Sequence, residues 1–262
     1  MEKEMVHRFE HRAMATPWMV SIASEDANAA ADAAREAFAL VDRIEEDLSR
    51  FQAMSYVGQL GRLKAGESLG VSPATFECLQ LGKAVWEATS GAFDMTVRRE
   101  PQEGWYSQME HIVLCDRMIV QVTEDQVAID LGGIGKGFAI DEITGLFLEH
   151  EVKNAFIDAG GSTHYGIGTL PGESEGWPAS LGDQGVIALD GQALSASGFE
   201  MQGYHVIDPR TGAPVETTRG RSWVMAGSAA LADALSTAAL IMTEEELGSF
   251  SEAHPDITIM LS

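Results

Sequence analysis

The sequence predicts an α+β fold in which helices pack on mixed, largely antiparallel sheets. Segments with helical periodicity and segments with strand-like alternation occur in both halves of the chain. Several β-rich runs follow one another with only short turns between them, which favours antiparallel pairing. Of the 262 residues, 45% are hydrophobic and 22% are charged, as in folded globular proteins. Because no Pro/Ser-rich linker divides the chain, we expect one domain over 1–262, with 1–13 and 255–262 peripheral.

The first ninety residues predict one strand followed by two helices. Alternation over 18–23 indicates the strand. The Ala-rich segment 28–51 has apolar residues at helical spacing, the last of them Phe51, and predicts a long amphipathic helix. Ser72 followed by Pro73 is an N-cap with proline at the first helical position, so a second helix begins there and ends near 90–91.

The rest of the chain alternates strands with three helices. A helix is expected after 135–137, running to about His150, and an Ala-rich one over 229–242, and Thr243 with Glu246 forms a capping-box pattern for a short third helix. The expected strands are 111–115, 117–122, 125–131, 154–158, 178–182, 185–190, 192–196, 204–208, 222–227 and 256–261.

Charge and composition exclude several classes of protein. The 17 Lys+Arg against 40 Asp+Glu give a net charge of −23, which excludes a general nucleic-acid binder because phosphate contacts require a basic face. No run is long enough for a signal h-region or a membrane span, so we expect a cytoplasmic protein, or a periplasmic one if a leader has been removed. Cys78 and Cys115 have no C-x-x-C context and are expected to be buried free thiols.

A glycine-rich segment, 130–141, joins a β-like run to a helix. Backbone amides at a helix N-terminus bind anions, and Lys136 adds a positive charge. The segment is neither a Walker A loop nor a dinucleotide-binding fingerprint, because its glycines have the wrong spacing. A tight corner for packing is an equally good interpretation of this segment alone. The D-x-G-G pattern of 130–133 recurs at 158–161, which suggests two related half-units.

A second candidate site lies in the Ala-rich helix. Asp233 and Thr237 are one helical turn apart and therefore on one face. A carboxylate and a hydroxyl at this spacing offer two hard oxygen ligands to Mg²⁺, which keeps waters and substrate phosphates as its other ligands. The alternative is that Asp233 forms a cap or salt bridge while Thr237 bonds to its own helix.

Two further stretches contain polar residues near turns. In 204–212, His205 precedes an Asp-Pro turn and is either an acid–base group or a hydrogen-bonded strand histidine. Residues 90–94, Ser-Gly-Ala-Phe-Asp, end a helix and are either part of a site or a glycine C-cap with an exposed acid.

Taken together, these stretches resemble the ApbE family of FAD:protein FMN transferases. Members share Met-Gly-Thr near the start, Ser-Gly-(Gly)-Ala-Phe-Asp, Asp-Leu-Gly-Gly-Ile-Ala-Lys-Gly, Asp-Ala-Gly-Gly, His-Ile-x-Asp-Pro-x-Thr-Gly-x-Pro and Ala-Asp-Ala-x-Ser-Thr-Ala. The matching segments here, in family order, are 14–16, 90–94, 130–137, 158–161, 205–214 and 232–238.

The resemblance implies binding of FAD with its diphosphate beside Mg²⁺, and transfer of FMN to a Thr or Ser hydroxyl of an acceptor protein with release of AMP. By position, Asp233, Thr237 and the backbone carbonyl of Gly135 correspond to the metal ligands, and His205 and Asp233 to the catalytic groups. The residues implied to bind the nucleotide are Met14, Ala15, Thr16, Ser90, Gly91, Ala92, Phe93, Asp94, Asp130, Gly132, Gly133, Lys136, Asp158, Gly160, Gly161, His205, Asp208 and Thr211.

The chain departs from the family pattern at several points. Ala15 replaces a glycine, Met95 stands where proline usually follows, and Ala196 replaces a hydroxyl residue. The base that assists the incoming hydroxyl is either Asp233 or His205. Two other activities fit the same residues: a metal-dependent FAD pyrophosphatase that yields FMN and AMP, and a protein that stores FAD without turnover.

Overall fold

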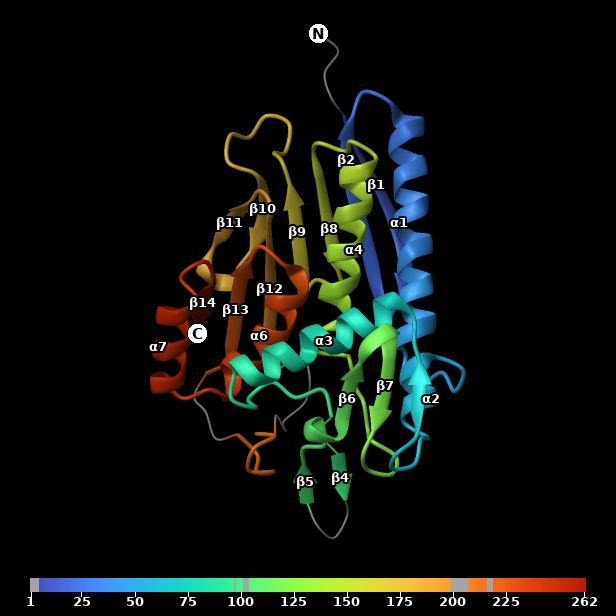
Figure 1. Ribbon diagram of the computed structural model, residues 1–262. Helices are drawn as coiled ribbons and strands as arrows, with labels where there is room; N and C mark the ends of the chain where they lie inside the picture. Colours follow the sequence, from blue (N-terminus) through green and yellow to red (C-terminus); the bar gives the residue numbers. More distant parts are fainter. Residues whose placement is uncertain (1–4, 97, 101–103, 199–206, 216–218) are drawn as a thin grey trace.

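The protein is built on one antiparallel sheet with helices on one of its faces (Figure 1). The computed structural model describes residues 5–96, 98–100, 104–198, 207–215 and 219–262. Among these residues, seven strands form the main sheet, and each pairs antiparallel with its neighbours. Their spatial order is β1 (Met5–Ala13), β2 (Thr16–Ser24), β8 (Ala155–Ala159), β9 (Thr163–Ile167), β12 (Gln192–Gly198), β13 (Arg221–Ala226) and β14 (Thr258–Leu261).

Three small sheets surround the main one. They are the sheet of β3 (Ser68–Gly70), β7 (Ile119–Val122) and β6 (Ile112–Cys115), the hairpin of β4 (Arg98–Glu100) and β5 (Gly104–Tyr106), and the pair β10 (Trp177–Ser180) and β11 (Val186–Leu189). Short 3-10 helices lie at Met109–His111, Asp116–Met118 and Gly182–Gln184.

Helices α1, α4 and α6 lie side by side in front of the main sheet, and α3 crosses below them (Figure 1). The helix bounds are α1 (Ala27–Leu48), α2 (Tyr56–Leu60), α3 (Pro73–Ala88), α4 (Gly135–Glu149), α6 (Ala229–Ile241) and α7 (Glu244–Ala253). None of the described helices is both long enough and apolar enough to cross a lipid bilayer.

Local sequence accounts for the ends of these helices. Asp26 caps α1 by accepting hydrogen bonds from the backbone N–H of Asn28 at 2.9 Å and of Ala29 at 3.1 Å. Ser72 caps α3 with Pro73 at its first position, as predicted. The capping box of Thr243 and Glu246 at the start of α7 is also confirmed. Each cap satisfies backbone N–H groups that have no partner inside the helix.

The main core lies between the sheet and helices α1, α4 and α6. Helix α1 buries an alanine-rich stripe, which lets it pack closely on its neighbours. Alternate residues of β12 point to opposite faces of the sheet, so Ser195 faces α6 whereas Leu194 belongs to a second apolar cluster. That second cluster joins the outer face of the sheet to β10 and β11. Hydroxyl side chains of β12 therefore point toward α6, where the candidate site lies.

Several elements differ from the sequence-based expectation. Segment 125–131 is not a strand, although it buries alternate residues, because its backbone joins Met95 through the Asp130 N–H and does not enter a ladder. Strand β1 was missed because it is a largely polar edge strand. Strand β9 was missed because it lies within a glycine-rich stretch. Most of the strand expected at 204–208 lies outside the described residues, and Ile207 forms an isolated bridge with Pro214.

The two cysteines are free thiols, as expected, but only one is fully buried. Cys78 on α3 is inaccessible, and burial raises the pKa of its thiol, an effect that the negative charge of Asp233 increases. Cys115 on β6 is half-buried, which corrects the expectation for that residue. The protonated Cys78 thiol therefore serves packing rather than chemistry.

Candidate functional site

The N-terminal ends of α4 and α6 cap each other, and this arrangement builds the site. Asp141 of α4 accepts hydrogen bonds at 2.7 Å from the Ala229 N–H and at 3.0 Å from the Ala230 N–H of α6. In return, Asp233 Oδ2 of α6 accepts a hydrogen bond at 3.1 Å from the Gly137 N–H of α4. Each carboxylate thus lies near the positive end of the other helix, where negative charge is favoured. Asp141 closes the glycine-rich segment in sequence, but its capping role was not predicted.

Gly137 allows this close approach. A Cβ atom at Gly137 would lie 2.1 Å from the Ala229 carbonyl oxygen and 2.7 Å from the Ala230 Cα. Backbone atoms cannot move aside as a flexible side chain can, so a residue with a side chain does not fit at this position. The packing interpretation of the glycine-rich segment is therefore correct for Gly137.

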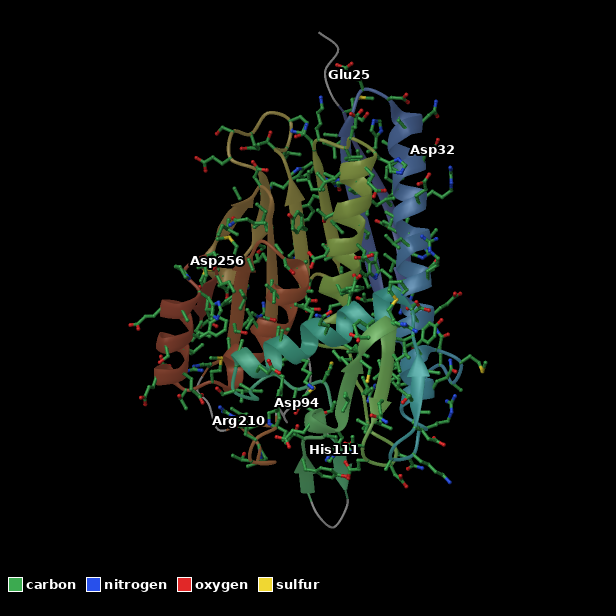
Figure 2. The ribbon with its side chains drawn as sticks, viewed as in Figure 1. Glu25, Asp32, Asp94, His111, Arg210 and Asp256 are labelled. Carbon is green, nitrogen blue, oxygen red and sulfur yellow. The ribbon has the colours of Figure 1, made fainter. Side chains whose placement is uncertain are left out.

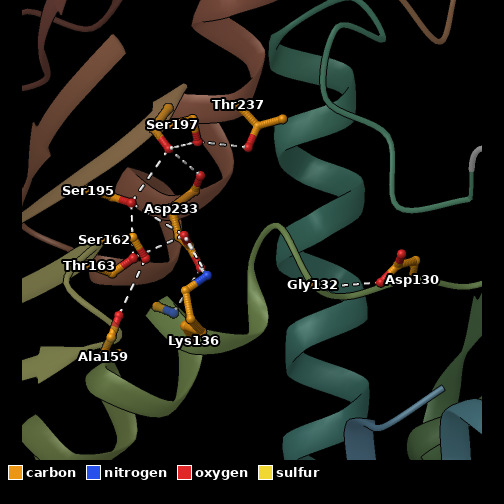
Figure 3. A network of polar contacts seen from close by, with 12 residues as sticks. Asp130, Gly132, Lys136, Ala159, Ser162, Thr163, Ser195, Ser197, Asp233 and Thr237 are labelled. Carbon is orange, nitrogen blue, oxygen red and sulfur yellow. Dashed lines mark hydrogen bonds and ion pairs between the residues drawn. The ribbon is translucent and has the colours of Figure 1, made fainter. Parts of the chain in front are cut away.

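Asp233 is the centre of the polar network in Figure 3. Its residue is 5% exposed, and Lys136 Nζ lies 3.4 Å from both of its carboxylate oxygens. Two hydroxyls donate to Oδ1: Thr163 on β9 at 3.1 Å and Ser195 on β12 at 3.3 Å. A buried carboxylate is costly unless such partners surround it, and here both oxygens have them.

Thr237 lies one turn beyond Asp233 and contacts the same strand. Its hydroxyl is 3.2 Å from the Ser197 hydroxyl, which is 2.8 Å from that of Ser236. Ser236 in turn donates to the Asp233 backbone carbonyl at 2.8 Å. The salt-bridge alternative for Asp233 is thus realised through Lys136, whereas the hydroxyl of Thr237 is in contact with β12.

These side chains surround a small pocket, called here the acid pocket, of about 180 Å³. Among the described residues that line it, Asp233 is the only carboxylate. The lining residues are Gly132, Gly133, Lys136, Ser162, Ala196, Ser197, Gly198, Asp233 and Thr237. Sequence reasoning did not place Ser162 or Ser197 in the site, because the turn between β8 and β9 and strand β12 meet α6 only in the folded chain.

The acid pocket fits one small divalent cation. Within the described part of the chain, no group of three or more His, Cys, Asp or Glu residues could hold a metal. Magnesium does not require such a cage, since one carboxylate together with waters and substrate phosphates can hold it. Asp233 and Thr237 supply hard oxygen atoms, and the Lys136 ammonium already occupies a cation position between the two carboxylate oxygens. Gly135 lines the neighbouring pocket, and its role as a ligand stays a prediction.

A second pocket of about 220 Å³, called here the aromatic pocket, adjoins the acid pocket. Gly132 and Lys136 line both pockets, and Met14, Ala15, Asp130 and Gly135 also line the aromatic one. Its walls bring together residues from three separate segments of the chain, 14–15, 45–51 and 130–136. Phe51 and Arg50 complete its lining.

Phe51 contradicts the prediction that it belongs to the buried face of the first long helix. Helix α1 ends at Leu48, and Phe51 is 83% exposed at the mouth of the aromatic pocket. The Arg50 guanidinium lies 4.6 Å from its ring centroid and forms an ion pair with Asp130 at 3.2 Å. An exposed aromatic ring beside a pocket is a typical stacking surface for a planar ligand. The sequence signal for it was weak: an aromatic residue just past a helix end.

The turn between β1 and β2 contains Ala15, one of the residues that depart from the family pattern. Met14 and Ala15 have φ of 49° and 58°, the left-handed conformation that favours glycine. Ala15 therefore adopts a conformation in which the glycine of related sequences would be less strained. The Met14 N–H donates to Glu45 Oε2 at 2.7 Å, which holds the turn against α1. Thr16 packs against Gly160, where a Cβ would lie 2.1 Å from its hydroxyl.

In each D-x-G-G corner the aspartate side chain accepts a hydrogen bond from a glycine N–H, but the chain continues differently after the two corners. Asp130 Oδ1 accepts from the Gly132 N–H at 3.0 Å, and Asp158 Oδ1 accepts from the Gly161 N–H at 2.7 Å. The first corner leads into α4, whereas the second joins the antiparallel strands β8 and β9. The second corner has Gly160 and Gly161 at positive φ, whereas the first has no positive-φ glycine, so the echo in the sequence reflects neither a common corner geometry nor a repeated topology. Ser162, which follows the second corner, reaches the acid pocket.

The segments 90–94 and 207–214 meet at a third pocket, of about 340 Å³. Its lining includes Ser90, Gly91, Asp94 and Thr211, and Figure 2 shows Asp94 near Arg210 and His111 at the lower end of the molecule. Ala92 and Phe93 are buried in the core instead, where Phe93 lies beneath Gly133. His205 lies outside the described residues.

Two carboxyl groups near this pocket have pKa values shifted in opposite directions. Burial raises the pKa of Asp94, although hydrogen bonds from Ser107 and Thr96 oppose it. Burial also acts to raise the pKa of Asp208, but three hydrogen bonds from Arg210, at 2.8 to 2.9 Å, outweigh it and lower that pKa. The two residues therefore make a matched pair for measuring pH-dependent stability.

The Asp94→Asn variant is expected to be stabilised relative to wild type at neutral pH. Because the pKa of Asp94 is raised on folding, its contribution to the free energy of unfolding is present at acid pH and lost as pH rises through the folded pKa. Asparagine resembles the protonated acid, so the difference from wild type should grow from about pH 4 to about pH 7. Urea unfolding across this range measures it.

The Asp208→Asn variant is the control, with the opposite sign. Since the pKa of Asp208 is lowered on folding, its stabilisation is present at neutral pH and lost as pH falls through the folded pKa. A difference between Asp94→Asn and wild type that shrinks as pH rises would contradict the assignment for Asp94.

The fold and the two joined pockets place a buried carboxylate and a lysine at a glycine-rich helix start beside an exposed aromatic ring. The ApbE family model matches residues 14–261, and the chain belongs to this family. It is accordingly an enzyme of the transferase class.

Similar proteins agree with this membership. The FAD:protein FMN transferase of Escherichia coli strain K12 is 23% identical over 277 residues, covering 90% of this chain and 78% of the relative. The apo form of Pseudomonas stutzeri flavinyl transferase ApbE superposes with a TM-score of 0.86 at 20% identity, covering 100% of this chain and 97% of that one. The ApbE protein of Thermotoga maritima gives a TM-score of 0.84 at 25% identity, covering 98% and 94%. The mixed α+β fold predicted from the sequence is confirmed.

Proposed function

We propose that this protein is an FAD:protein FMN transferase that uses Mg²⁺ to move FMN from FAD to a Thr or Ser hydroxyl of an acceptor protein, releasing AMP. The observation that carries the proposal is the acid pocket, in which Asp233, Thr237 and Lys136 adjoin a pocket with an exposed aromatic ring. A flavin nucleotide has the matching chemistry, since a planar ring is linked to a diphosphate. The names of the related proteins point the same way.

In this proposal the two pockets divide the ligand between them. The flavin ring stacks on Phe51 in the aromatic pocket, and the diphosphate lies at the acid pocket beside Lys136. Bound Mg²⁺ supplies charge neutralisation to the diphosphate. Asp233 and Thr237 would hold that cation, and Thr163 and Ser195 fix the position of the carboxylate. Such preorganised charges matter because the reaction is controlled mainly by positioning and electrostatics.

The contacts of Asp233 favour a role in holding a cation over a role as the base. Both of its oxygens accept hydrogen bonds, from Gly137, Thr163 and Ser195, and both face Lys136. A base needs a free oxygen toward the incoming hydroxyl. We therefore assign proton removal to His205 and cation binding to Asp233.

The strongly acidic chain makes the local charge of the site decisive. With a net charge of −23, the protein repels a diphosphate in solution. Only a cation at Asp233 together with Lys136 makes the acid pocket attractive to the ligand. Binding of FAD is therefore expected to weaken when the metal is chelated.

One experiment separates transfer from the two alternatives. The protein is incubated with FAD, Mg²⁺ and an acceptor protein, and the acceptor mass and free FMN and AMP are measured. A mass gain equal to FMN on the acceptor supports transfer, free FMN with AMP supports a pyrophosphatase, and intact bound FAD supports storage. A parallel incubation with EDTA tests the metal: undiminished transfer there would contradict the role proposed for Mg²⁺.

Removal of the exposed ring should weaken FAD binding more than it slows the chemical step. For Phe51→Ala we expect the Kd for FAD to rise roughly tenfold or more, since stacking on an aromatic side chain contributes about 1–3 kcal/mol. Phe51→Trp should retain most of the affinity. Quenching of flavin fluorescence measures the Kd for FAD of both variants. Met54→Ala is the matched control, because Met54 is 82% exposed but does not line the pocket; equal effects of the two alanine variants would argue against stacking.

A further inference from the structure

The groups that the sequence assigns to the diphosphate are in contact with Asp233 in the structure. The Gly137 N–H at the start of α4 donates to Asp233 Oδ2 at 3.1 Å, and Lys136 Nζ lies 3.4 Å from each oxygen. The side chain of Asp233 is 6% exposed and that of Lys136 is 22% exposed. The protein's own carboxylate is therefore the anion at this helix N-terminus (Figure 3).

The ion pair is longer than the other hydrogen bonds to the Asp233 carboxylate. Charge-assisted hydrogen bonds between an ammonium and a carboxylate are usually about 2.7–2.9 Å long, shorter than the 3.4 Å found here. Gly137, Thr163 and Ser195 hold Asp233 at 3.1 to 3.3 Å without help from the lysine. Asp233 can therefore keep its position when Lys136 moves away.

The side chain of Lys136 has space to move between the two pockets. It lines both the acid pocket and the aromatic pocket, so its side chain lies at the boundary that a ligand spanning the two would cross. A lysine ammonium is a compact charge on a flexible four-carbon chain, and it can change partner by rotating that chain. A diphosphate at this boundary would compete with Asp233 for the ammonium.

The charges of the site balance only when neither ligand or both ligands are present. With Asp233 and Lys136 alone the two charges cancel. A divalent cation alone adds an excess of positive charge next to Lys136, and a diphosphate alone adds an excess of negative charge next to Asp233. When both bind, their charges cancel each other as well. A partly buried pocket disfavours the two unbalanced states.

We propose that Lys136 is a built-in counter-ion that occupies the cation position at Asp233 and is released to the diphosphate when the metal binds. This inference rests on the function proposed above. Metal binding at Asp233 frees the Lys136 ammonium for the diphosphate, and a diphosphate that binds the ammonium frees Asp233 for the metal. Lys136 therefore adds positive coupling between metal and FAD to the direct attraction of the two ligands. The coupling is reciprocal: the factor by which metal tightens FAD binding equals the factor by which FAD tightens metal binding.

The test compares wild type with Lys136→Gln, Lys136→Arg and Lys83→Gln. Lys83 is the control for loss of one positive charge, because its Nζ donates to the Ile112 carbonyl at 3.0 Å and does not line either pocket. Binding of Mn²⁺ to the FAD-free protein is measured by titration calorimetry and by the electron paramagnetic resonance signal of free Mn²⁺. Binding of FAD is then measured with and without Mn²⁺. Circular dichroism verifies that each variant is folded.

Removal of the competing ammonium in Lys136→Gln should tighten Mn²⁺ binding to the FAD-free protein roughly tenfold. The factor by which Mn²⁺ tightens FAD binding is typically about 5- to 150-fold for coupled sites, and it should fall toward a few-fold in this variant. Lys83→Gln should behave as wild type does. Lys136→Arg keeps the positive charge in a larger group, so it should lie between wild type and Lys136→Gln. Equal or weaker Mn²⁺ binding by Lys136→Gln, or unchanged coupling, would overturn the inference. Transfer to an acceptor is assayed separately, so a protein with this coupling but without transfer would defeat the proposed function alone.

Discussion

The Asp233→Asn variant is expected to lose FMN transfer by roughly 10³-fold, because loss of the negative charge removes the residue proposed to hold the cation. The amide nitrogen of asparagine would also face two donors, the Gly137 N–H and the Lys136 ammonium. We therefore expect a further cost of about 1–3 kcal/mol in the free energy of unfolding, since a buried donor is left without a partner. The rate of mass gain on the acceptor and urea unfolding measure the two effects.

The matched control for this variant is Asp256→Asn. Asp256 is an exposed carboxylate just before β14 that does not line the acid pocket, and its replacement should leave both quantities unchanged (Figure 2). Mn²⁺ binding by Asp233→Asn is compared with that of wild type, to separate loss of the metal ligand from loss of the folded state. If folded Asp233→Asn bound Mn²⁺ as wild type does and still transferred FMN at a similar rate, Asp233 would not be the metal ligand.

The second large effect is expected at Gly137. A methyl group there would lie 2.1 Å from the Ala229 carbonyl oxygen, so Gly137→Ala must push α4 and α6 apart. Separation of the helices breaks both reciprocal caps, those of Asp141 and Asp233. We expect a loss of at least about 3–5 kcal/mol in the free energy of unfolding, the range reserved for changes that disrupt packing and buried polar contacts together.

Gly145→Ala is the control on the same helix. No atom lies within 4 Å of a Cβ built at Gly145, so alanine there should raise the free energy of unfolding by about 0.5–1 kcal/mol through its better helix propensity. Urea denaturation of the two variants measures the contrast. If Gly137→Ala unfolded at the same urea concentration as Gly145→Ala, the close approach of α4 and α6 would be refuted.

The acid pocket shows how far local sequence reasoning reaches. That Asp233 and Thr237 share a helix face follows from their spacing, and both line the pocket. That Lys136 lies in a glycine-rich segment at the N-terminal side of a helix was also predicted, although the helix begins at Gly135, slightly earlier than expected. Their contact was not predicted, because Lys136 and Asp233 are 97 positions apart and meet only when α4 packs against α6.

Phe51 shows the opposite case, in which a correct local pattern gave a wrong environment. Its spacing continues the apolar stripe of α1, yet the helix ends three residues earlier and the ring is exposed. Periodicity identifies residues on one face but does not say where the helix stops or what lies beyond it. The segment 125–131 failed in the same way, since buried alternation without a pairing partner does not make a strand.

By itself, the sequence determined the helices other than α2, the caps of α3 and α7, most strands and the family. Each of these depends on residues within one or two turns of each other or on motifs read in order. Only the tertiary structure decided which groups share the pocket: the hydroxyls of β9 and β12 around Asp233, the exchange of caps between α4 and α6, and the Lys136 ion pair. The physical reason is distance along the chain. Burial and electrostatic balance depend on which distant elements pack together, and no local pattern encodes that packing directly.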